Sequence, residues 1–183
     1  MNKQFKKHSS KQSLWSKPSI EEILKKERMP LFVVLDNIRS THNVGAIFRS
    51  CDALMASKIF LCGITAHPPR ADIAKAALGA DLTVPWEYVP TTQETLLKLK
   101  ENGVRICGLE LAEGSQHYKE ARYDFPLALV LGNEVDGVSD ECMELLDMCV
   151  QIPMLGRANS LNVATAFGIV GYEILWQYGQ SKG

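Results

Sequence analysis

Four short apolar runs restrict the fold of this chain more than any other feature of its sequence. They occupy residues 31–35, 58–62, 104–109 and 127–131, and polar residues hardly interrupt them. A run of this kind is typical of a strand buried on both faces. Helical patterns lie between and after them, at residues 43–55, 70–78, 92–102 and 140–148, and a further short strand is expected at 149–152. This alternation predicts an α/β fold with a mostly parallel sheet and helices on both faces.

The chain has 183 residues, which suits one domain preceded by a basic arm. Residues 1–17 hold five lysines and no acid, and Ser19 with Glu22 forms a capping box that predicts a short helix ending near Arg28. We therefore expect an arm with a short helix at 1–30 and one domain at 31–183. The arm is either a solvated tail or an RNA contact. The rest of the chain has 15 basic and 21 acidic residues, so a nucleic acid would have to be held by local basic patches rather than by a generally positive surface.

Cysteines and histidines give no sign of a metal or disulfide framework. The five cysteines are odd in number and form no C-x-x-C, and the four histidines are scattered. The chain also lacks G-x-G and a phosphate loop, which argues against an ordinary dinucleotide or P-loop site. With no membrane-length apolar run and no hydrophobic signal core, we expect a soluble cytoplasmic protein without a metal.

Three segments, at residues 43–49, 131–137 and 152–162, mix glycine with polar groups where apolar runs end. Loops at strand ends are where open α/β sheets build their sites. In the first segment, Asn43 is placed to cap a helix and Gly45 permits close packing at its first turn. Arg49 is expected about one turn beyond, near the same helix end, where its guanidinium suits a phosphate. In the second, Gly132 leaves room for a ligand and Glu134 offers a carboxylate.

The second segment leads to a helix that Ser139 or Asp140 would cap. The third opens the final helix, expected at 161–178, with Ser160 and Asn162 at its positive end. That helix is apolar on more than one face and needs cover on most sides. A second copy of the chain would provide it, giving a twofold homodimer. The alternative is a fully internal helix of a monomer.

In the same order, these segments resemble the motifs of the SpoU/TrmH-type (SPOUT) family of knotted RNA ribose 2′-O-methyltransferases, from about residue 31 to 178. The resemblance implies a C-terminal trefoil knot around S-adenosylmethionine, an RNA substrate and a homodimer. It assigns catalytic roles to Arg49, Asn43, Glu134, Ser160 and Asn162. It assigns the cofactor to backbone around Gly132, Ile152 and Leu161, with Leu109 and Met154 as candidates to wall the adenine.

Family accounts treat the arginine as the proton acceptor, but arginine is permanently charged in proteins. We therefore expect Arg49 to anchor a phosphate and stabilise the developing alkoxide. One departure is Val135, where the family usually has glycine, because a β-branched residue rarely adopts positive φ. Val135 supports a second hypothesis, that the chain is a non-catalytic RNA-binding or ribosome-assembly protein. A third hypothesis is a methyltransferase that acts on small molecules or proteins. Transfer RNA is the preferred substrate and ribosomal RNA stays open.

Overall fold

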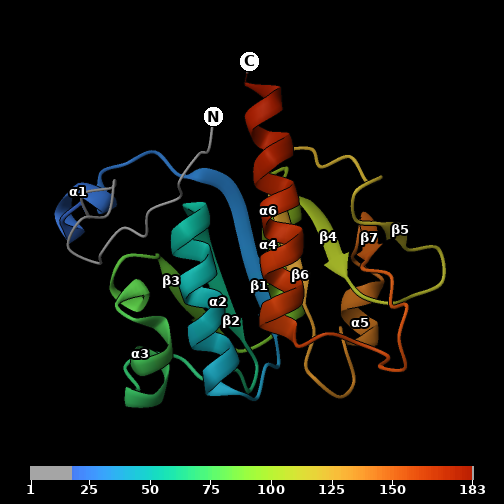
Figure 1. Ribbon diagram of the computed structural model, residues 1–183, viewed down its shortest axis with the longest axis horizontal. Helices are drawn as coiled ribbons and strands as arrows, with labels where there is room; N and C mark the ends of the chain where they lie inside the picture. The colour runs from blue at the N-terminus through green and yellow to red at the C-terminus, as the bar shows by residue number, and fades with distance from the viewer. Residues whose placement is uncertain (1–17, 183) are drawn as a thin grey trace, which may run out of the picture.

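A seven-stranded, entirely parallel sheet forms the centre of the computed structural model, which describes residues 18–182. The lysines at 1–17 therefore lie outside the described residues. The strand order is β3-β2-β1-β6-β4-β7-β5 (Figure 1). The strands are β1 Met29–Asp36, β2 Ala56–Cys62, β3 Trp86–Val89, β4 Arg105–Leu109, β5 Gln116–His117, β6 Leu127–Leu131 and β7 Met148–Gln151. The helices are α1 Ile20–Leu24, α2 Thr41–Leu54, α3 Ala71–Ala77, the 3₁₀ turn η1 Ala80–Leu82, α4 Thr92–Glu101, α5 Asp140–Met143 and α6 Val163–Ser181.

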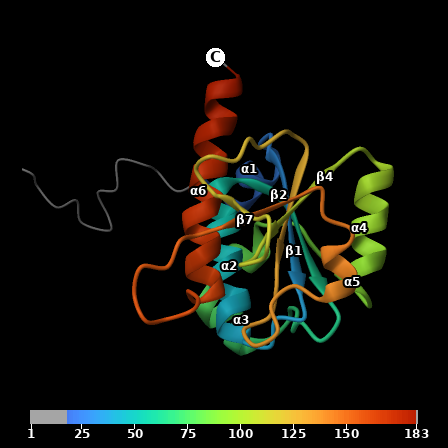
Figure 2. The ribbon, with the colours of Figure 1, turned by 90° about the vertical axis from the view of Figure 1, so that its right-hand side faces the viewer.

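Helices cover both faces of the sheet, as predicted. Figure 2 shows α2, α3 and α6 on one side and α4 and α5 on the other. Within β1, Val33 and Leu35 join the core under α2 and α6, while Val34 joins the core under α4, and all three are fully buried. Burial on both sides explains why the strand reads as a continuous apolar run.

The four predicted strands are confirmed as β1, β2, β4 and β6, and the short strand expected at 149–152 is β7. Two strands were not predicted. β3 is an edge strand in which two of four residues are exposed, and β5 has only two residues, so neither forms an apolar run. An edge strand needs cover on fewer sides, and its sequence carries less of the strand signal.

Two predicted helices are shorter in the structure. The capping box at Ser19 is present, but α1 ends at Leu24. Arg28 instead donates hydrogen bonds from its guanidinium to the carbonyls of Ala56 and Thr83. α5 ends at Met143 rather than near 148, because Asp147 is held at the start of β4, where its carboxylate accepts from the Ile106 amide at 2.7 Å.

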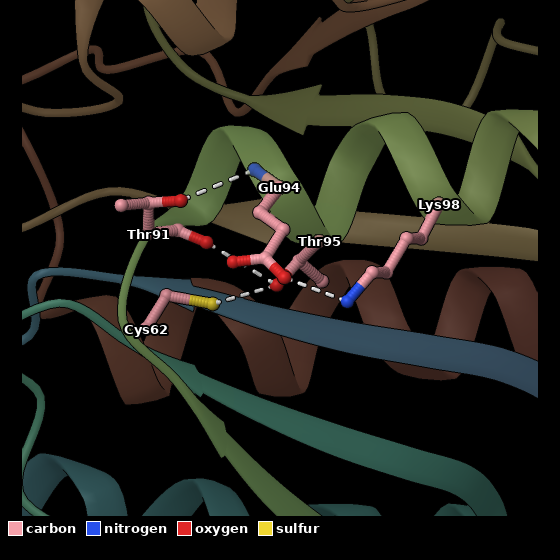
Figure 3. A network of polar contacts seen from close by, with 5 residues as sticks. All are labelled: Cys62, Thr91, Glu94, Thr95 and Lys98. Atoms are coloured by element: carbon pink, nitrogen blue, oxygen red, sulfur yellow. Dashed lines mark hydrogen bonds and ion pairs between the residues drawn. The ribbon is translucent and has the colours of Figure 1, made fainter.

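A polar network anchors the start of α4 to the end of β2 (Figure 3). Thr91 caps the helix by accepting from the Glu94 amide at 3.3 Å. The hydroxyl of Thr95 lies 3.4 Å from both the Thr91 carbonyl and the Cys62 sulfur. On the exposed side, Glu94 pairs with Lys98 at 2.6 Å. The network positions α4 on its face of the sheet.

Gly45 lets α2 lie directly against α3, which confirms the close packing predicted from the sequence. A Cβ placed on Gly45 would lie 2.5 Å from the Ala76 Cβ and 2.7 Å from the Ile73 carbonyl oxygen. Both distances are shorter than any ordinary contact. Only glycine therefore fits at this crossing.

The chain turns from one side of the sheet to the other at β1, which has β2 on one side and β6 on the other. In open α/β sheets, ligands bind at the carboxyl ends of the strands near such a point. These ends lie at the bottom of Figure 1. The trefoil knot stays a prediction from the family resemblance. None of the described helices is long and apolar enough to cross a membrane.

Candidate active site

A cavity of about 380 Å³ opens at the carboxyl ends of β4, β6 and β7. Its wall is built from the loops that follow these strands and from the first turn of α6. Eight of the ten predicted site residues line it: Leu109, Gly132, Glu134, Ile152, Met154, Ser160, Leu161 and Asn162. The second and third predicted segments, which are separated in the sequence, therefore meet around one space.

A chain of hydrogen bonds joins all three segments at the cavity wall. The Asn162 amide nitrogen donates to Asn43 Oδ1 at 3.0 Å, and Asn43 Nδ2 donates to Glu134 Oε1 at 2.7 Å. Asn43 is 6% exposed, whereas Glu134 is exposed. Glu134 Oε2 accepts no hydrogen bond from another described residue. The chain thus runs from the exposed Asn162 through the buried amide of Asn43 to a carboxylate with a free acceptor.

Asn162 also begins α6, because its Oδ1 accepts from the backbone amides of Ala164 and Thr165 at 3.1 and 3.3 Å. α6 therefore starts at Val163, two residues later than predicted. Ser160 lies exposed at the rim and makes no hydrogen bond to another described residue.

The prediction that Asn43 caps its helix is wrong. Ser40 is the N-cap of α2, and its hydroxyl oxygen accepts from the Asn43 amide at 3.2 Å. Asn43 lies in the first turn of α2, three residues after the N-cap, so its side chain is not needed to cap the helix. Its side chain is thereby free to bridge Asn162 and Glu134.

Gly132 is required by the loop itself rather than by a ligand. A Cβ on Gly132 would overlap the backbone of Gly137 and Val138. The loop is closed by paired backbone hydrogen bonds between Asn133 and Gly137, at 3.0 and 3.1 Å. Gly132 still lines the cavity, so its predicted contact with the cofactor stays a prediction.

Val135 does not strain this loop. Among the described residues it is not one of those with positive φ, and the left-handed position belongs to Gly137, with φ of 72°. The Val135 amide donates to Asn133 Oδ1 at 2.8 Å, and its side chain is 76% exposed. The departure from glycine at Val135 therefore requires no unusual backbone conformation in the loop that carries Glu134.

Glu110, at the end of β4, is a cavity residue that the sequence analysis missed. Its Oε1 accepts from the Leu111 amide at 2.9 Å and its Oε2 accepts from the Val138 amide at 3.0 Å. It therefore ties the loop after β4 to the loop after β6. Its place directly after the apolar run 104–109 is the signal that could have identified it.

Asp36, at the end of β1, was also missed. It is 1% exposed, and its Oδ2 accepts from the amide and the hydroxyl of Ser139 at 2.9 and 2.8 Å. Its Oδ1 accepts from the Thr92 hydroxyl and from Asn37 Nδ2. Ser139 lies at the N-cap position of α5, as predicted, but its side chain makes no capping hydrogen bond.

Arg49 lies outside the cavity of its own chain. It is six residues beyond Asn43 on α2, which corresponds to about 9 Å along the helix and about 240° around it. Its side chain is exposed and makes no ion pair with a described residue. The expectation that Arg49 lies near the same helix end as Asn43 is therefore not met within one chain.

α6 carries an exposed apolar stripe beside α2. Phe167, Val170 and Ile174 are fully buried on its inner side. On its outer side Ile169, Tyr172 and Trp176 are 36%, 55% and 63% exposed. The alternative of a fully internal helix is therefore wrong.

Backbone groups in the cavity fit a nucleoside cofactor. The peptide groups of Ile152 and Leu161 make no backbone hydrogen bond to another described residue, and both side chains are half-buried. Peptide groups without a protein partner on the wall of an open cavity are available to hydrogen-bond to a ligand or to solvent. Apolar side chains of Leu109 and Met154 line the same space and suit an aromatic base. The residues present therefore fit S-adenosylmethionine held mainly by backbone.

The thiols do not offer a nucleophile. All five cysteines are free, and burial raises the pKa of the Cys62 thiol to about 11. Burial likewise raises the pKa of each of the others, Cys51, Cys107, Cys142 and Cys149. Within residues 18–182 no three metal-ligating side chains gather.

Comparison with known proteins identifies the family that this chain resembles. A model described as the SpoU rRNA Methylase family matches residues 30–172. A tRNA (guanosine(18)-2′-O)-methyltransferase of Aquifex aeolicus is 37% identical over 155 residues, which cover 84% of this chain and 72% of that protein. A 23S rRNA (guanosine-2′-O-)-methyltransferase RlmB of Vibrio parahaemolyticus is 35% identical over 158 residues, covering 86% and 64%.

Among solved structures, the SpoU methyltransferase AviRb from Streptomyces viridochromogenes, in complex with the cofactor AdoMet, superimposes with a TM-score of 0.77. It is 28% identical, and the match covers 88% of this chain and 65% of that one. The chain thus spans about two thirds of the length of AviRb and of the Vibrio protein.

Proposed function

The chain belongs to the SpoU rRNA Methylase family, and we propose that it transfers a methyl group from S-adenosylmethionine to a ribose 2′-hydroxyl of RNA. The observation that carries this proposal is the hydrogen-bond chain from Asn162 through Asn43 to Glu134 at the wall of one cavity. The names of both relatives, which specify guanosine 2′-O-methylation, support the same chemistry.

Transfer RNA is our preferred substrate over ribosomal RNA. The Aquifex relative, whose name specifies tRNA, matches over more of its own length than the Vibrio relative, whose name specifies 23S rRNA. A compact RNA read by shape and phosphate contacts also suits a short chain. Together with the free thiols, an RNA substrate of this kind supports a cytoplasmic enzyme.

The cofactor supplies a methyl group that its sulfonium already activates. The task of the chain is therefore to hold the cofactor and to align the ribose hydroxyl with it, and alignment alone contributes about 7–11 kcal/mol in favourable cases. In our proposal the backbone of Gly132, Ile152 and Leu161 holds the cofactor, and Leu109 and Met154 flank its adenine.

The polar chain orients the hydroxyl. Asn162 is fixed as the cap of α6, and it fixes the Asn43 amide, which in turn fixes Glu134 Oε1. Glu134 Oε2 is then free to accept a hydrogen bond from another donor group of the target nucleotide, which leaves the proton of the reacting hydroxyl free to depart. Ser160, at the rim, is placed to contact the RNA or the incoming arginine.

Arg49 acts from a second chain in our proposal. It is exposed on α2, beyond the cavity of its own chain, and the apolar stripe of Ile169, Tyr172 and Trp176 lies on the neighbouring helix. A twofold dimer that covers this stripe would bring Arg49 of one copy toward the cavity of the other. There it anchors the phosphate beside the target ribose and stabilises the developing alkoxide, while the proton leaves to that phosphate or to water.

The first test uses tritiated S-adenosylmethionine with bulk transfer RNA and, separately, ribosomal RNA, followed by mapping of the labelled nucleotide. We expect label on a ribose of the transfer RNA pool, lost with Arg49→Ala. Label on ribosomal RNA alone would overturn the substrate preference. Cofactor binding without transfer to either pool would favour the non-catalytic scaffold, whose only sequence support was Val135, and transfer to small acceptors alone would favour the third hypothesis.

A mixing experiment tests the shared site. Arg49→Ala and Asn43→Ala would each be inactive alone, but in a mixed dimer one site holds both lesions and the other holds neither. Activity that returns on mixing and refolding supports an arginine supplied by the partner copy. An inactive mixture, with mixed dimers shown by native mass spectrometry, would place both residues in one chain's site.

A further inference from the structure

Three aromatic rings form a cluster at the edge of the sheet, far from the cavity along the strand order. His67 follows β2, and Trp86 and Tyr88 belong to the edge strand β3. The His67 ring stacks on Trp86 with a centroid distance of 5.9 Å and an interplanar angle of 21°. It lies 5.0 Å from the Tyr88 ring at 45°. Tyr88 is 43% exposed and His67 is exposed.

The cluster is rigidly supported from below. Trp86 packs against the core under α2 and α3. The Gly63 amide donates to the Val89 carbonyl at 3.1 Å, which ties the loop carrying His67 to the end of β3. The His67 ring is itself oriented by a 2.8 Å hydrogen bond between Nδ1 and the Pro68 carbonyl. The rings therefore present a fixed surface rather than three independent side chains.

The same loop is joined to the end of β1, beside the polar chain of the active site. The Ile38 amide donates to Thr65 Oγ1 at 3.0 Å, and the Ile64 amide donates to Asn37 Oδ1 at 3.1 Å. Thr65 Oγ1 donates in turn to the Leu35 carbonyl at 3.2 Å. The cluster and the cavity thus lie at the same end of the sheet and are connected by ordered loops.

The separation suits a short stretch of RNA. From β6, at the cavity, to β3 the strand order takes three steps, which correspond to about 14 Å at the usual strand spacing. This is about the rise of four stacked nucleotides at ~3.4 Å each. A strand entering the cavity with its target ribose would therefore pass the aromatic rings within a few nucleotides.

Two exposed arginines lie in the loops after β1 and β2, the loops that join the cluster to the end of β1. Arg39 is exposed directly after the β1 loop and makes no ion pair with a described residue. Arg70 is exposed at the start of α3, three residues beyond His67, and its Nη2 forms an ion pair with Asp72 Oδ2 at 3.1 Å. Exposed rings flanked by arginines are what single-stranded nucleic acid requires, since bases stack on the rings and phosphates meet the cations.

We infer that His67, Trp86 and Tyr88 form a stacking platform for an unpaired base of the substrate RNA, a few nucleotides from the methylated ribose. This inference rests on the proposed function, because it takes the RNA to enter the cavity. The platform extends recognition beyond the cavity and gives the enzyme a preference for RNA whose strand is unpaired near the target.

The test measures RNA affinity and methylation separately in the full-length protein. The probes are an unpaired ten-nucleotide oligoadenosine and bulk transfer RNA, both labelled with fluorescein, with Kd measured by anisotropy. We expect Tyr88→Ala to weaken binding of both by about 5- to 150-fold, the range for loss of one stacked base. Tyr88→Phe, which keeps the ring, is the matched variant and should bind as the unaltered protein does.

His67→Ala provides the second variant, and S-adenosylmethionine binding by calorimetry checks that each variant is folded. Weaker RNA binding with an unchanged cofactor Kd supports the platform. Unchanged RNA binding in both alanine variants overturns it. If no RNA is methylated but Tyr88→Ala still weakens RNA binding, the platform stands and the proposed reaction fails, so the two failures are distinguishable.

Discussion

Two polar clusters at the carboxyl ends of neighbouring strands have similar chemistry and opposite exposure. At the end of β1, the carboxylate of Asp36 is 1% exposed and accepts four hydrogen bonds, from Asn37, Thr92 and twice from Ser139. After β6, the carboxylate of Glu134 is exposed and accepts one, from Asn43. We call these the closed cluster and the open cluster.

The difference shows how a protein separates stability from function at one end of a sheet. A buried carboxylate is tolerated only when its oxygens are fully hydrogen-bonded, so the closed cluster has no capacity left for a ligand. The open cluster keeps a free oxygen beside a cavity, where solvent can satisfy it until a ligand binds. The closed cluster should therefore report on stability and the open cluster on activity.

The largest effect is expected for Asp36→Ala in the closed cluster. It leaves the Ser139 amide and the Thr92 hydroxyl without a buried partner, and we expect the free energy of unfolding to fall by about 3–5 kcal/mol. Urea unfolding followed by circular dichroism measures it. Ser139→Ala, which removes a single hydroxyl, is the smaller companion at about 1 kcal/mol. A loss below 1 kcal/mol for Asp36→Ala would show that this cluster is not a stability element.

The open cluster should show the reverse pattern. Glu134→Gln keeps the size of the side chain and removes its charge, and we expect methyl transfer to fall about 100-fold, or about 2.7 kcal/mol in the barrier. The urea midpoint should hardly change. Single-turnover kinetics with saturating cofactor gives the rate, and Asp136→Asn, an exposed acid in the same loop, is the matched control. Full activity in Glu134→Gln would remove the carboxylate from the mechanism.

Gly45→Ala tests the packing that brings the open cluster together. Its Cβ would contact Ala76 and the Ile73 carbonyl, and displacing α3 should cost about 1–3 kcal/mol of stability. Thermal unfolding measures the change. In the single chain, a Cβ at Gly168 in α6 would have no atom within 4 Å beyond the nearby backbone of its own helix, so Gly168→Ala should be neutral or stabilising by about 0.5–1 kcal/mol. Equal effects of the two substitutions would contradict the proposed crowding.

The smallest effect is expected on the exposed side of the network at α4. Lys98→Ala breaks a solvent-exposed pair with Glu94 that spans one helical turn, and such pairs contribute about 0.3–0.5 kcal/mol. The difference from the unaltered protein should disappear in 1 M salt, where screening acts over about 3 Å. A salt-independent loss would mean that Lys98 acts through packing.

Several structural features could be predicted from the sequence because they depend on residues that are close together in the chain. Apolar runs marked the strands that are buried on both faces, and the capping box at Ser19 marked the start of α1. The exposed strand β3 and the two-residue β5 carried no such pattern. Asp36 and Glu110 were overlooked for a related reason, since a single acid after a strand looks like any surface loop until its partners are known.

The sequence by itself determined the α/β class, the order of the main elements and the three segments that make the site. Only the tertiary structure decided that Asn43 bridges Glu134 and Asn162 instead of capping a helix, and that Arg49 does not line the cavity of its own chain. The physical reason is range. Periodicity and capping depend on residues a few positions apart, whereas these hydrogen bonds join residues 91 and 119 positions apart, which only the folded sheet brings together.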